Sequence, residues 1–164
     1  ERVAGKLRFV PGAPDLHILH SWLQVGEVCS ADSTLAQRLP GLKSHPHLNK
    51  VYPFNTLYLP SESLELYGQS TGMAGSGMFP HWSDQRQLTW PGELRTVWRL
   101  PECFWPEHCD PVMSYHRQLE RWQRRDGEVL LNAAYRGQEF VVTSKDESAV
   151  LNWLRELGLF SQTS

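Results

Sequence analysis

The sequence contains no apolar run of the roughly 18 residues that a membrane-spanning helix needs, and its first residues show no secretory leader pattern. Its three cysteines, Cys29, Cys103 and Cys109, are odd in number and irregular in spacing, which argues against a disulfide scaffold. We therefore expect a protein of the reducing cytoplasm that does not enter a membrane.

The sequence also lacks an excess of positive charge, since 16 Lys and Arg residues against 18 Asp and Glu residues give a formal net charge of −2. Proteins that hold nucleic acid through phosphate contacts alone are usually clearly basic, so this class is excluded. A pocket for one base or nucleotide needs fewer cations and stays open. The seven tryptophans among 164 residues suit both sheet cores and stacking on bases.

Motifs of the common nucleotide-binding and hydrolytic sites are missing as well. No lysine follows the glycine-rich stretch 68–77 in a phosphate-binding loop pattern, and no GxGxxG opens a helix. No GxSxG marks a nucleophilic serine. The glycine-rich stretch is predicted as a flexible turn, or as a binding loop whose amides contact an anion.

Short extended segments dominate the chain, whose length favours a single domain over residues 1–164. Because the strands do not alternate with helices, a doubly wound parallel sheet is excluded. We expect an α+β fold, with a small, mostly antiparallel curled sheet or barrel and two or three peripheral helices. Strands are predicted at 6–10, 16–29 with a bulge or bend at Gly26, 55–59, 64–67, 88–90, 96–100, 129–135 and 139–143.

Three helices are predicted. A short one spans 33–39 and ends before a Pro-Gly pair. A second spans 115–125, where apolar residues recur at spacings of four and three. The third begins at a capping-box pair, Ser144 and Glu147, and stops at Gly158.

The sequence His45-Pro46-His47 is the first candidate site. Two imidazoles two residues apart can ligate zinc or copper if a further ligand comes from elsewhere, such as His81, His108, Cys103 or Cys109. No standard zinc spacing joins these residues, so we predict neither a bound metal nor a cofactor. The alternative is a turn in which the imidazoles bond to the backbone.

A second candidate site is Ser114-Tyr115-His116, which offers a hydroxyl, a phenol and an imidazole for orienting a base or for proton transfer. The alternative is a capping serine, a core tyrosine and a surface histidine. Four arginines follow, which could meet phosphate oxygens or form a solvated face. They are Arg117, Arg121, Arg124 and Arg125.

Two further segments offer polar and aromatic groups. In the predicted tight hairpin at 136–139, Gln138 can read a base edge, and Arg136 can meet a phosphate or stack on a ring. The alternative is a turn with Arg136 and Glu139 in water. Trp22 and Gln24 share one predicted strand and could form a stacking wall with a hydrogen-bonding group, or they could be structural core.

Nine motifs occur in a recognisable order. They are WLQVGEV (22–28), HPH (45–47), NTLYL (55–59), GSGMF (75–79), QLTWPG (87–92), WRLPECFWP (98–106), SYH (114–116), RW (121–122) and RGQEFV (136–141). This series resembles the bacterial nucleotide modification associated domain family, third type, over about residues 16–160. The resemblance implies a context of nucleic-acid modification rather than a particular reaction.

The same resemblance implies a further upstream strand segment of the GDLFLFFGWF kind, which is missing from this sequence. More distantly, the pairing of such a segment with WLQVGEV is similar to the barrels of PUA-like domains of the EVE and ASCH types. Those barrels hold a modified base or nucleotide in an aromatic-lined pocket.

We therefore predict a module that binds nucleic acid or a nucleotide through a modified base, in an aromatic and polar pocket. The alternatives are an enzyme acting on a nucleobase or nucleotide, and a protein-interaction or anti-defence partner; the oligomeric state is not predicted. The pocket requires distant residues such as Trp22, His47, His116 and Gln138 to share one cavity. The predicted ligand-binding residues are Trp22, Gln24, His45, His47, Asn55, Ser114, Tyr115, His116, Arg136, Gln138 and Glu139.

Overall fold

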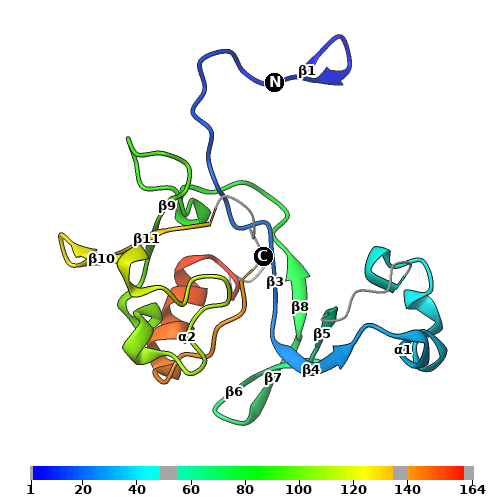
Figure 1. The fold of residues 1–164 in the computed structure, drawn as a ribbon. Coiled ribbons are helices and arrows are strands. Elements are labelled where there is room, and N and C mark those ends of the chain that lie inside the picture. Colours follow the sequence, from blue (N-terminus) through cyan, green and yellow to red (C-terminus); the bar gives the residue numbers. More distant parts are fainter. Residues whose placement is uncertain (1, 49–54, 135–139, 161–164) are drawn as a thin grey trace. The chain divides into compact units, whose positions relative to one another are not determined.

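The computed structural model describes residues 2–48, 55–134 and 140–160, and Figure 1 shows the path of the chain. Every strand pair in it is antiparallel, which confirms the predicted α+β class with mostly antiparallel sheets. The described strands form five separate sheets and do not close into a barrel. No described helix has the length and apolar character needed to cross a membrane.

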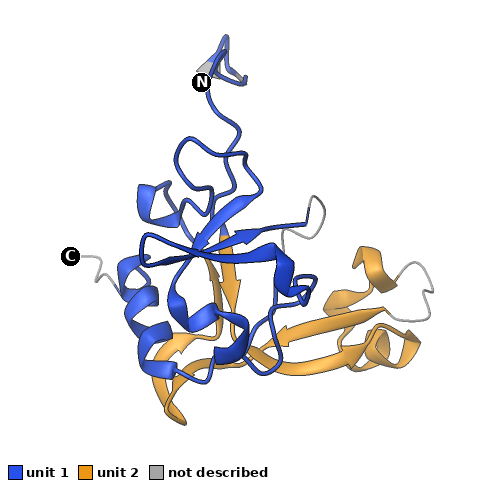
Figure 2. Cartoon of the chain, turned by 60° about the vertical axis from the view of Figure 1, so that its left-hand side comes forward, with its two compact units in different colours: residues 1–20, 79–164 blue, residues 21–78 orange. Residues whose placement is uncertain are grey.

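The chain divides into two compact units, drawn in different colours in Figure 2. Unit 1 comprises residues 1–20 and 79–164, and unit 2 comprises residues 21–78. Unit 1 contains β1 (Arg2–Val3), β2 (Lys6–Leu7), η3 (Asp84–Arg86), β9 (Val97–Leu100), η4 (Glu102–Phe104), η5 (Pro106–His108), η6 (Leu119–Arg121), β10 (Trp122–Arg125), β11 (Glu128–Asn132) and α2 (Glu147–Glu156). Unit 2 contains β3 (Ser21–Leu23), β4 (Val25–Ser30), α1 (Ser33–Arg38), η1 (Pro40–Leu42), η2 (Pro46–Leu48), β5 (Thr56–Pro60), β6 (Ser63–Leu66), β7 (Gln69–Ala74) and β8 (Ser76–Met78).

The main sheet of unit 1 has the strand order β10–β11–β9. Leu131 of β11 pairs with Trp122 on one side and with Trp98 on the other, while Val129 pairs with Leu100. These five side chains are at most 4% exposed and lie on the same face. Each such large apolar side chain stabilises the fold by about 1.5–3 kcal/mol when it leaves water, so this face anchors unit 1.

The predicted helix over 115–125 is wrong, because Trp122–Arg125 forms strand β10 and Leu119–Arg121 is a single 3₁₀ turn. Asp126 and Gly127 have φ angles of 52° and 81°, and Arg125 pairs directly with Glu128 across them. Two consecutive positive φ angles define a type I′ hairpin turn, for which Asp-Gly is a preferred sequence. The turn therefore requires strands on both sides of it.

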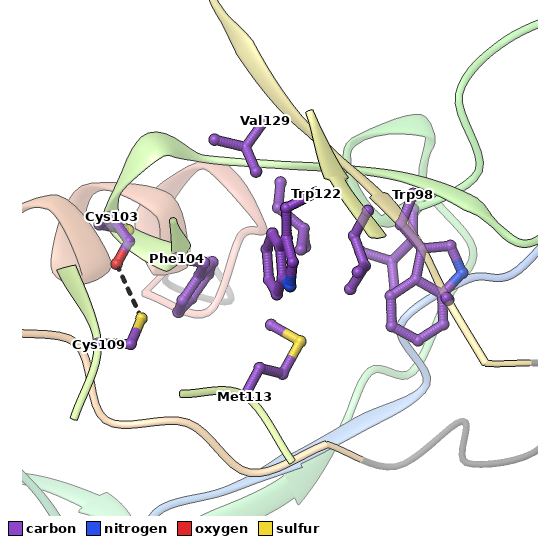
Figure 3. Packing of buried hydrophobic residues seen from close by; sticks show 11 residues of the cluster. Trp98, Cys103, Phe104, Cys109, Met113, Trp122 and Val129 are labelled. Carbon is purple, nitrogen blue, oxygen red and sulfur yellow. Dashed lines mark hydrogen bonds between the residues drawn. The ribbon is translucent and has the colours of Figure 1, made fainter. Parts of the chain in front are cut away.

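A hydrophobic core lies between this sheet and the segment 103–113, which is part of the connection from β9 to β10. In Figure 3, Phe104, Trp122 and Met113 point toward one another, with Cys103 and Cys109 beside them. Helix α2 covers this core with one apolar side, and its Trp153 ring meets the Phe104 ring edge-to-face at 4.9 Å between centroids. The packing explains why the apolar stripe of α2 follows a helical period.

Helix α2 starts at a different cap from the predicted one. The carboxylate of Asp146 accepts a hydrogen bond from Ala149 N at 2.9 Å, whereas Ser144 Oγ donates to the Cys103 carbonyl at 2.9 Å. The predicted stop at Gly158 is confirmed by its φ of 79° just beyond the helix. The predicted strand over 139–143 is wrong for its described part, 140–143, which belongs to no ladder.

Several predicted strands are shorter in the structure. Only Lys6–Leu7 of the segment 6–10 is a strand, and the long segment 16–29 is broken into a bridge at Ile18 and the strands β3 and β4. The segment 88–90 contributes a single bridge from Thr89 to Trp98. By contrast, α1 and β5 are confirmed, and the register of β4 shifts at Gly26 as expected for a bulge.

The prediction of a flexible turn or loop over 68–77 is also wrong, because this stretch contains β7 and β8. Close backbone contacts require two glycines in unit 2, Gly75 of this stretch and Gly26 of β4. A Cβ atom at Gly75 would lie 2.0 Å from the carbonyl oxygen of Ser61, and one at Gly26 would lie 2.7 Å from Ser61 Cα. Backbones approach this closely only where side chains are missing.

Candidate functional site

The predicted ligand-binding residues are distributed over both units. Ser114, Tyr115 and His116 belong to unit 1. Trp22, Gln24, His45, His47 and Asn55 belong to unit 2. Arg136, Gln138 and Glu139 lie outside the described residues, as does the predicted hairpin across Arg136-Gly137, so a cavity shared by the whole set stays a prediction.

Ser114 anchors a tight turn over residues 113–116. The backbone N–H of His116 donates to the carbonyl of Met113 at 3.1 Å, which closes the turn. Ser114 N donates to the Val141 carbonyl at 2.9 Å, and Val141 N donates to Ser114 Oγ at 2.8 Å. The serine hydroxyl therefore fastens the turn to a segment that is distant in sequence.

His116 is fully buried and both of its ring nitrogens are engaged. Nε2 lies 3.0 Å from the backbone N–H of Ala134, which can only donate, and Nδ1 lies 2.8 Å from the Ser114 carbonyl, which can only accept. The neutral tautomer with hydrogen on Nδ1 satisfies both partners. Burial lowers the pKa of His116 and outweighs the opposite effect of the hydrogen bond with Ser114, and the nearby Arg121 also lowers it, so the ring is a neutral structural link.

Tyr115 has the opposite environment, because 70% of the residue is exposed. The interpretation of this motif as a core tyrosine beside a surface histidine is therefore wrong. Its φ of 65° places Tyr115 in the left-handed region. With the hydrogen bond from His116 to Met113, this geometry matches a type II turn, whose third position normally holds glycine.

The other described non-glycine residues with positive φ explain why Tyr115 is unusual. Ala4, Tyr67 and Asp126 each precede a glycine with positive φ, in two-residue turns that join paired strands. Tyr115 is followed by His116 and joins no strands. A bulky residue in this conformation costs about 1–2 kcal/mol, and a largely exposed ring recovers little of that through burial.

The four arginines predicted to form one basic stripe divide into two pairs. Arg124 forms an ion pair with Glu102 at 2.6 Å, and Arg125 forms one with Glu93 at 3.0 Å. Arg121 donates only to uncharged groups, Gln118 Oε1 and the Asn132 carbonyl. Arg117 has no hydrogen-bond or ion-pair partner within the described part of the chain. The two cations nearest Tyr115 in sequence are therefore not neutralised by described carboxylates.

In unit 2, Trp22 and Gln24 are both tied to neighbouring strands. A Cβ atom at Gly77 would lie 3.2 Å from Trp22 Nε1, so the indole packs against that glycine. The Gln24 amide donates to the Glu65 carbonyl and accepts from Glu65 N, each at 2.8 Å, and it accepts from Ser61 Oγ at 3.1 Å. Gln24 thus links the break between β3 and β4 to β6 and to Ser61 in the β5–β6 connection, and its role as a base-reading group stays a prediction.

The structure brings His45, His47 and Asn55 together. The two imidazole centroids are 5.5 Å apart, and His47 Nδ1 lies 2.6 Å from Asn55 Oδ1. Asn55 Nδ2 also donates to the backbone carbonyl of His47. His47 and Asn55 are 8 residues apart in the sequence, and their pairing could not be derived from that spacing.

A concavity of about 310 Å³ opens beside α1, and sequence reasoning missed it. Across it, Arg38 pairs with Glu27 at 2.7 Å and donates to Cys29 Sγ at 3.1 Å. Loss of solvation raises the pKa of the Cys29 thiol. The lining residues are Glu27, Val28, Cys29, Ser30, Asp32, Thr34, Leu35 and Arg38.

The remaining cysteines are buried thiols. Burial raises the pKa of Cys103 to about 11 and also raises that of Cys109. Thiols of this kind are poor nucleophiles and poor metal ligands, because both roles need the thiolate. Within residues 2–48, 55–134 and 140–160, no three His, Cys, Asp or Glu side chains are arranged to hold a metal ion.

The family model described as nucleotide modification associated domain 3 matches residues 4–143. The chain belongs to this family. Its membership indicates a role related to nucleotide modification. No match was found among curated proteins, and none among solved structures. The matched region of this nucleotide modification associated domain includes all of unit 2 and the Tyr115 turn of unit 1.

Proposed function

We propose that this domain binds a modified base, in nucleic acid or as a nucleotide, by stacking the base on the ring of Tyr115. The observation that carries the proposal is the combination of exposure and backbone conformation at Tyr115, which is 70% exposed at a φ of 65°. Strained residues of this kind concentrate at functional sites, where the surrounding structure holds them in place.

The surroundings of Tyr115 are suited to presenting a ring rigidly. Ser114 bonds twice to Val141, and His116 bonds through its ring to Ala134. The residues on both sides of the tyrosine are thereby fixed to other parts of unit 1. A stacking platform that is already ordered loses less entropy on binding, and stacking contributes about 1–3 kcal/mol per base.

Charge supports a nucleotide or nucleic acid rather than an uncharged base. Arg117 and Arg121 follow the tyrosine without a carboxylate partner among the described residues, so they are available to phosphate oxygens. A local pair of cations is compatible with a net charge of −2, because only one or two phosphates need to be neutralised. Gln138 belongs to the same proposal as a group that reads the base edge, and Arg136 belongs to it as a group that meets a phosphate or stacks on a ring. Glu139 stays a predicted ligand-binding residue.

Titration of labelled single-stranded oligonucleotides, with modified and unmodified bases, tests the proposal. Tyr115→Ala is expected to weaken binding by roughly 5- to 150-fold, the equivalent of one lost stacking contact. Tyr115→Phe keeps the ring and should bind like the unchanged protein. Arg117→Gln should weaken binding mainly at low salt.

Tyr67→Ala is the matched control, because Tyr67 is also exposed and has a φ of 53°, but lies in unit 2 at the β6–β7 turn. It should leave the affinity unchanged. Equal affinities for the Tyr115→Ala variant and the unchanged protein, with every oligonucleotide, would exclude Tyr115 as the stacking group.

A further inference from the structure

Asn55 holds His47 through two contacts, and together they determine the state of the imidazole. The backbone carbonyl of His47 can only accept a hydrogen bond, so the Asn55 NH₂ group must face it. The side-chain oxygen of Asn55, Oδ1, then faces His47 Nδ1 at 2.6 Å. Since this oxygen can only accept, Nδ1 must carry the hydrogen.

The consequence is that Nε2 of the neutral His47 ring carries a free lone pair. His47 is exposed, so this lone pair is accessible to a ligand. The hydrogen bond made by one ring nitrogen sets the role of the other, which is how proteins orient an imidazole as an acceptor. His45 is in the reverse state, because its Nδ1 accepts from His47 N at 3.3 Å and its neutral ring therefore carries hydrogen on Nε2.

One backbone hydrogen bond links Asn55 to the segment that lines the concavity of unit 2. The backbone carbonyl of Asn55 accepts a hydrogen bond from Ala31 N at 2.9 Å. Ala31 is flanked by Ser30 and Asp32, which line the concavity. Asn55 thus connects the fixed ring of His47 with the rim of a concavity of about 310 Å³.

The lining of the concavity favours hydroxyl groups over phosphate. It contains two carboxylates, Glu27 and Asp32, and one guanidinium, Arg38, which is already paired with Glu27. A phosphate would meet net negative charge there. Asp32 Oδ1 already accepts from Thr34 and Leu35 at the start of α1. The other carboxyl oxygen of Asp32 and the side-chain hydroxyl of Ser30 are instead good partners for the hydroxyls of a neutral polyol.

We infer that unit 2 contains a second binding site, in which His47 Nε2 accepts a hydrogen bond from the vicinal hydroxyls of a sugar such as ribose. Asn55 is the positioning residue of this site. The inference is independent of the stacking function proposed for Tyr115, because that residue belongs to the other unit.

The probe that tests the inference is methyl β-D-ribofuranoside, which has vicinal hydroxyls but no base that could stack on Tyr115. Nuclear magnetic resonance of ¹⁵N-labelled protein should show His47 with hydrogen on Nδ1, and its Nε2 resonance should shift as the sugar is added. His47→Ala and Asn55→Ala should each weaken sugar binding by roughly five- to tenfold, as expected for one neutral hydrogen bond.

Three controls make the result specific. Tetrahydrofurfuryl alcohol lacks the vicinal hydroxyls and should cause no shift at His47. His81→Ala removes an exposed histidine of unit 1 and should leave sugar binding unchanged, as should Tyr115→Ala. A His47 ring with hydrogen on Nε2, or a sugar titration that leaves its resonances in place, would overturn the inference.

Discussion

The indole N–H of Trp98 donates a hydrogen bond to Nδ1 of His17 over 2.8 Å. Because an indole nitrogen can only donate, His17 Nδ1 must be free of hydrogen. The same indole lies 5.7 Å from the ring of His116, whose Nε2 must likewise accept from Ala134. Both histidines beside the Trp98 ring, the half-buried His17 and the buried His116, are therefore required in their neutral forms.

Stability is expected to depend on these two histidines at acid pH. Burial lowers the pKa of both His17 and His116 below the ordinary value of 6.5. Below about pH 6.5 the unfolded chain therefore binds more protons than the folded one, and the stability is lost progressively as the pH falls toward the folded-state pKa values. Above about pH 6.5 the two groups contribute no pH dependence. Urea unfolding at a series of pH values measures this slope.

A matched pair of variants tests whether His17 causes this pH dependence of stability. His17→Gln retains an oxygen that can accept from Trp98 but does not titrate, so the slope at acid pH should become smaller. His81→Gln replaces an exposed histidine and should leave the slope as it is. An unchanged slope in the His17→Gln variant would show that this ring is not held neutral by burial.

Tyr115→Gly should separate stability from binding. Glycine tolerates a φ of 65° without strain but increases the entropy of the unfolded chain, so the free energy of unfolding should stay the same or rise by up to about 1 kcal/mol. Binding should be lost together with the ring. Tyr115→Val should lower the free energy of unfolding by about 1 kcal/mol or more, because β-branched residues avoid this conformation. A large loss of stability in the glycine variant would mean that the ring is needed for the fold instead.

Gly127→Ala tests the hairpin that replaces the predicted helix. A φ of 81° strains any residue with a Cβ, although the space around Gly127 is open, so we expect a loss of about 1 kcal/mol in the free energy of unfolding. Gly41→Ala is the control, because that position is equally open and has no positive φ. Thermal or urea unfolding should show destabilisation in the first variant only, and equal effects of the two substitutions would contradict the turn geometry.

Gln24→Glu tests whether the Gln24 amide is structural. The substitution keeps the shape and the acceptor oxygen but removes the donor to the Glu65 carbonyl, so it should cost about 1–3 kcal/mol in the free energy of unfolding. Gln24→Met, which removes both contacts with Glu65, should be at least as destabilising. Hydrogen exchange of the Glu65 amide reports the change locally, and unchanged protection in both variants would argue against the link.

The elements that could be predicted from the sequence are those with local signals. The helix α1 ends before Pro40-Gly41, β5 contains Thr56 and Tyr58 in alternation with leucines, and α2 stops before Gly158. In contrast, the spacing of Tyr115, Leu119 and Trp122 matched a helical period by coincidence. The Asp-Gly pair that follows was the stronger signal, because a type I′ turn cannot continue a helix.

The candidate sites depend on contacts that no local pattern encodes. Ser114 is bonded to Val141, 27 residues away, and His116 to Ala134, 18 residues away. Sequence reasoning selected Tyr115 and His116 together, yet burial separates them into an exposed ring and a core ring. Which residue faces water was decided by the tertiary packing of the turn over 113–116, and a motif of three residues contains no information about that.

The match to the family ends at residue 143, whereas the side chains of Ala149, Val150 and Trp153 that seal the core come from α2, beyond that limit. The region that the family model matches is therefore shorter than the region that packs into the core of unit 1. A shortened polypeptide that stops where the similarity stops would expose the aromatic surface around Phe104 to solvent, with aggregation as the expected outcome. Anyone who excises the domain for biophysical work should therefore keep the chain through Phe160.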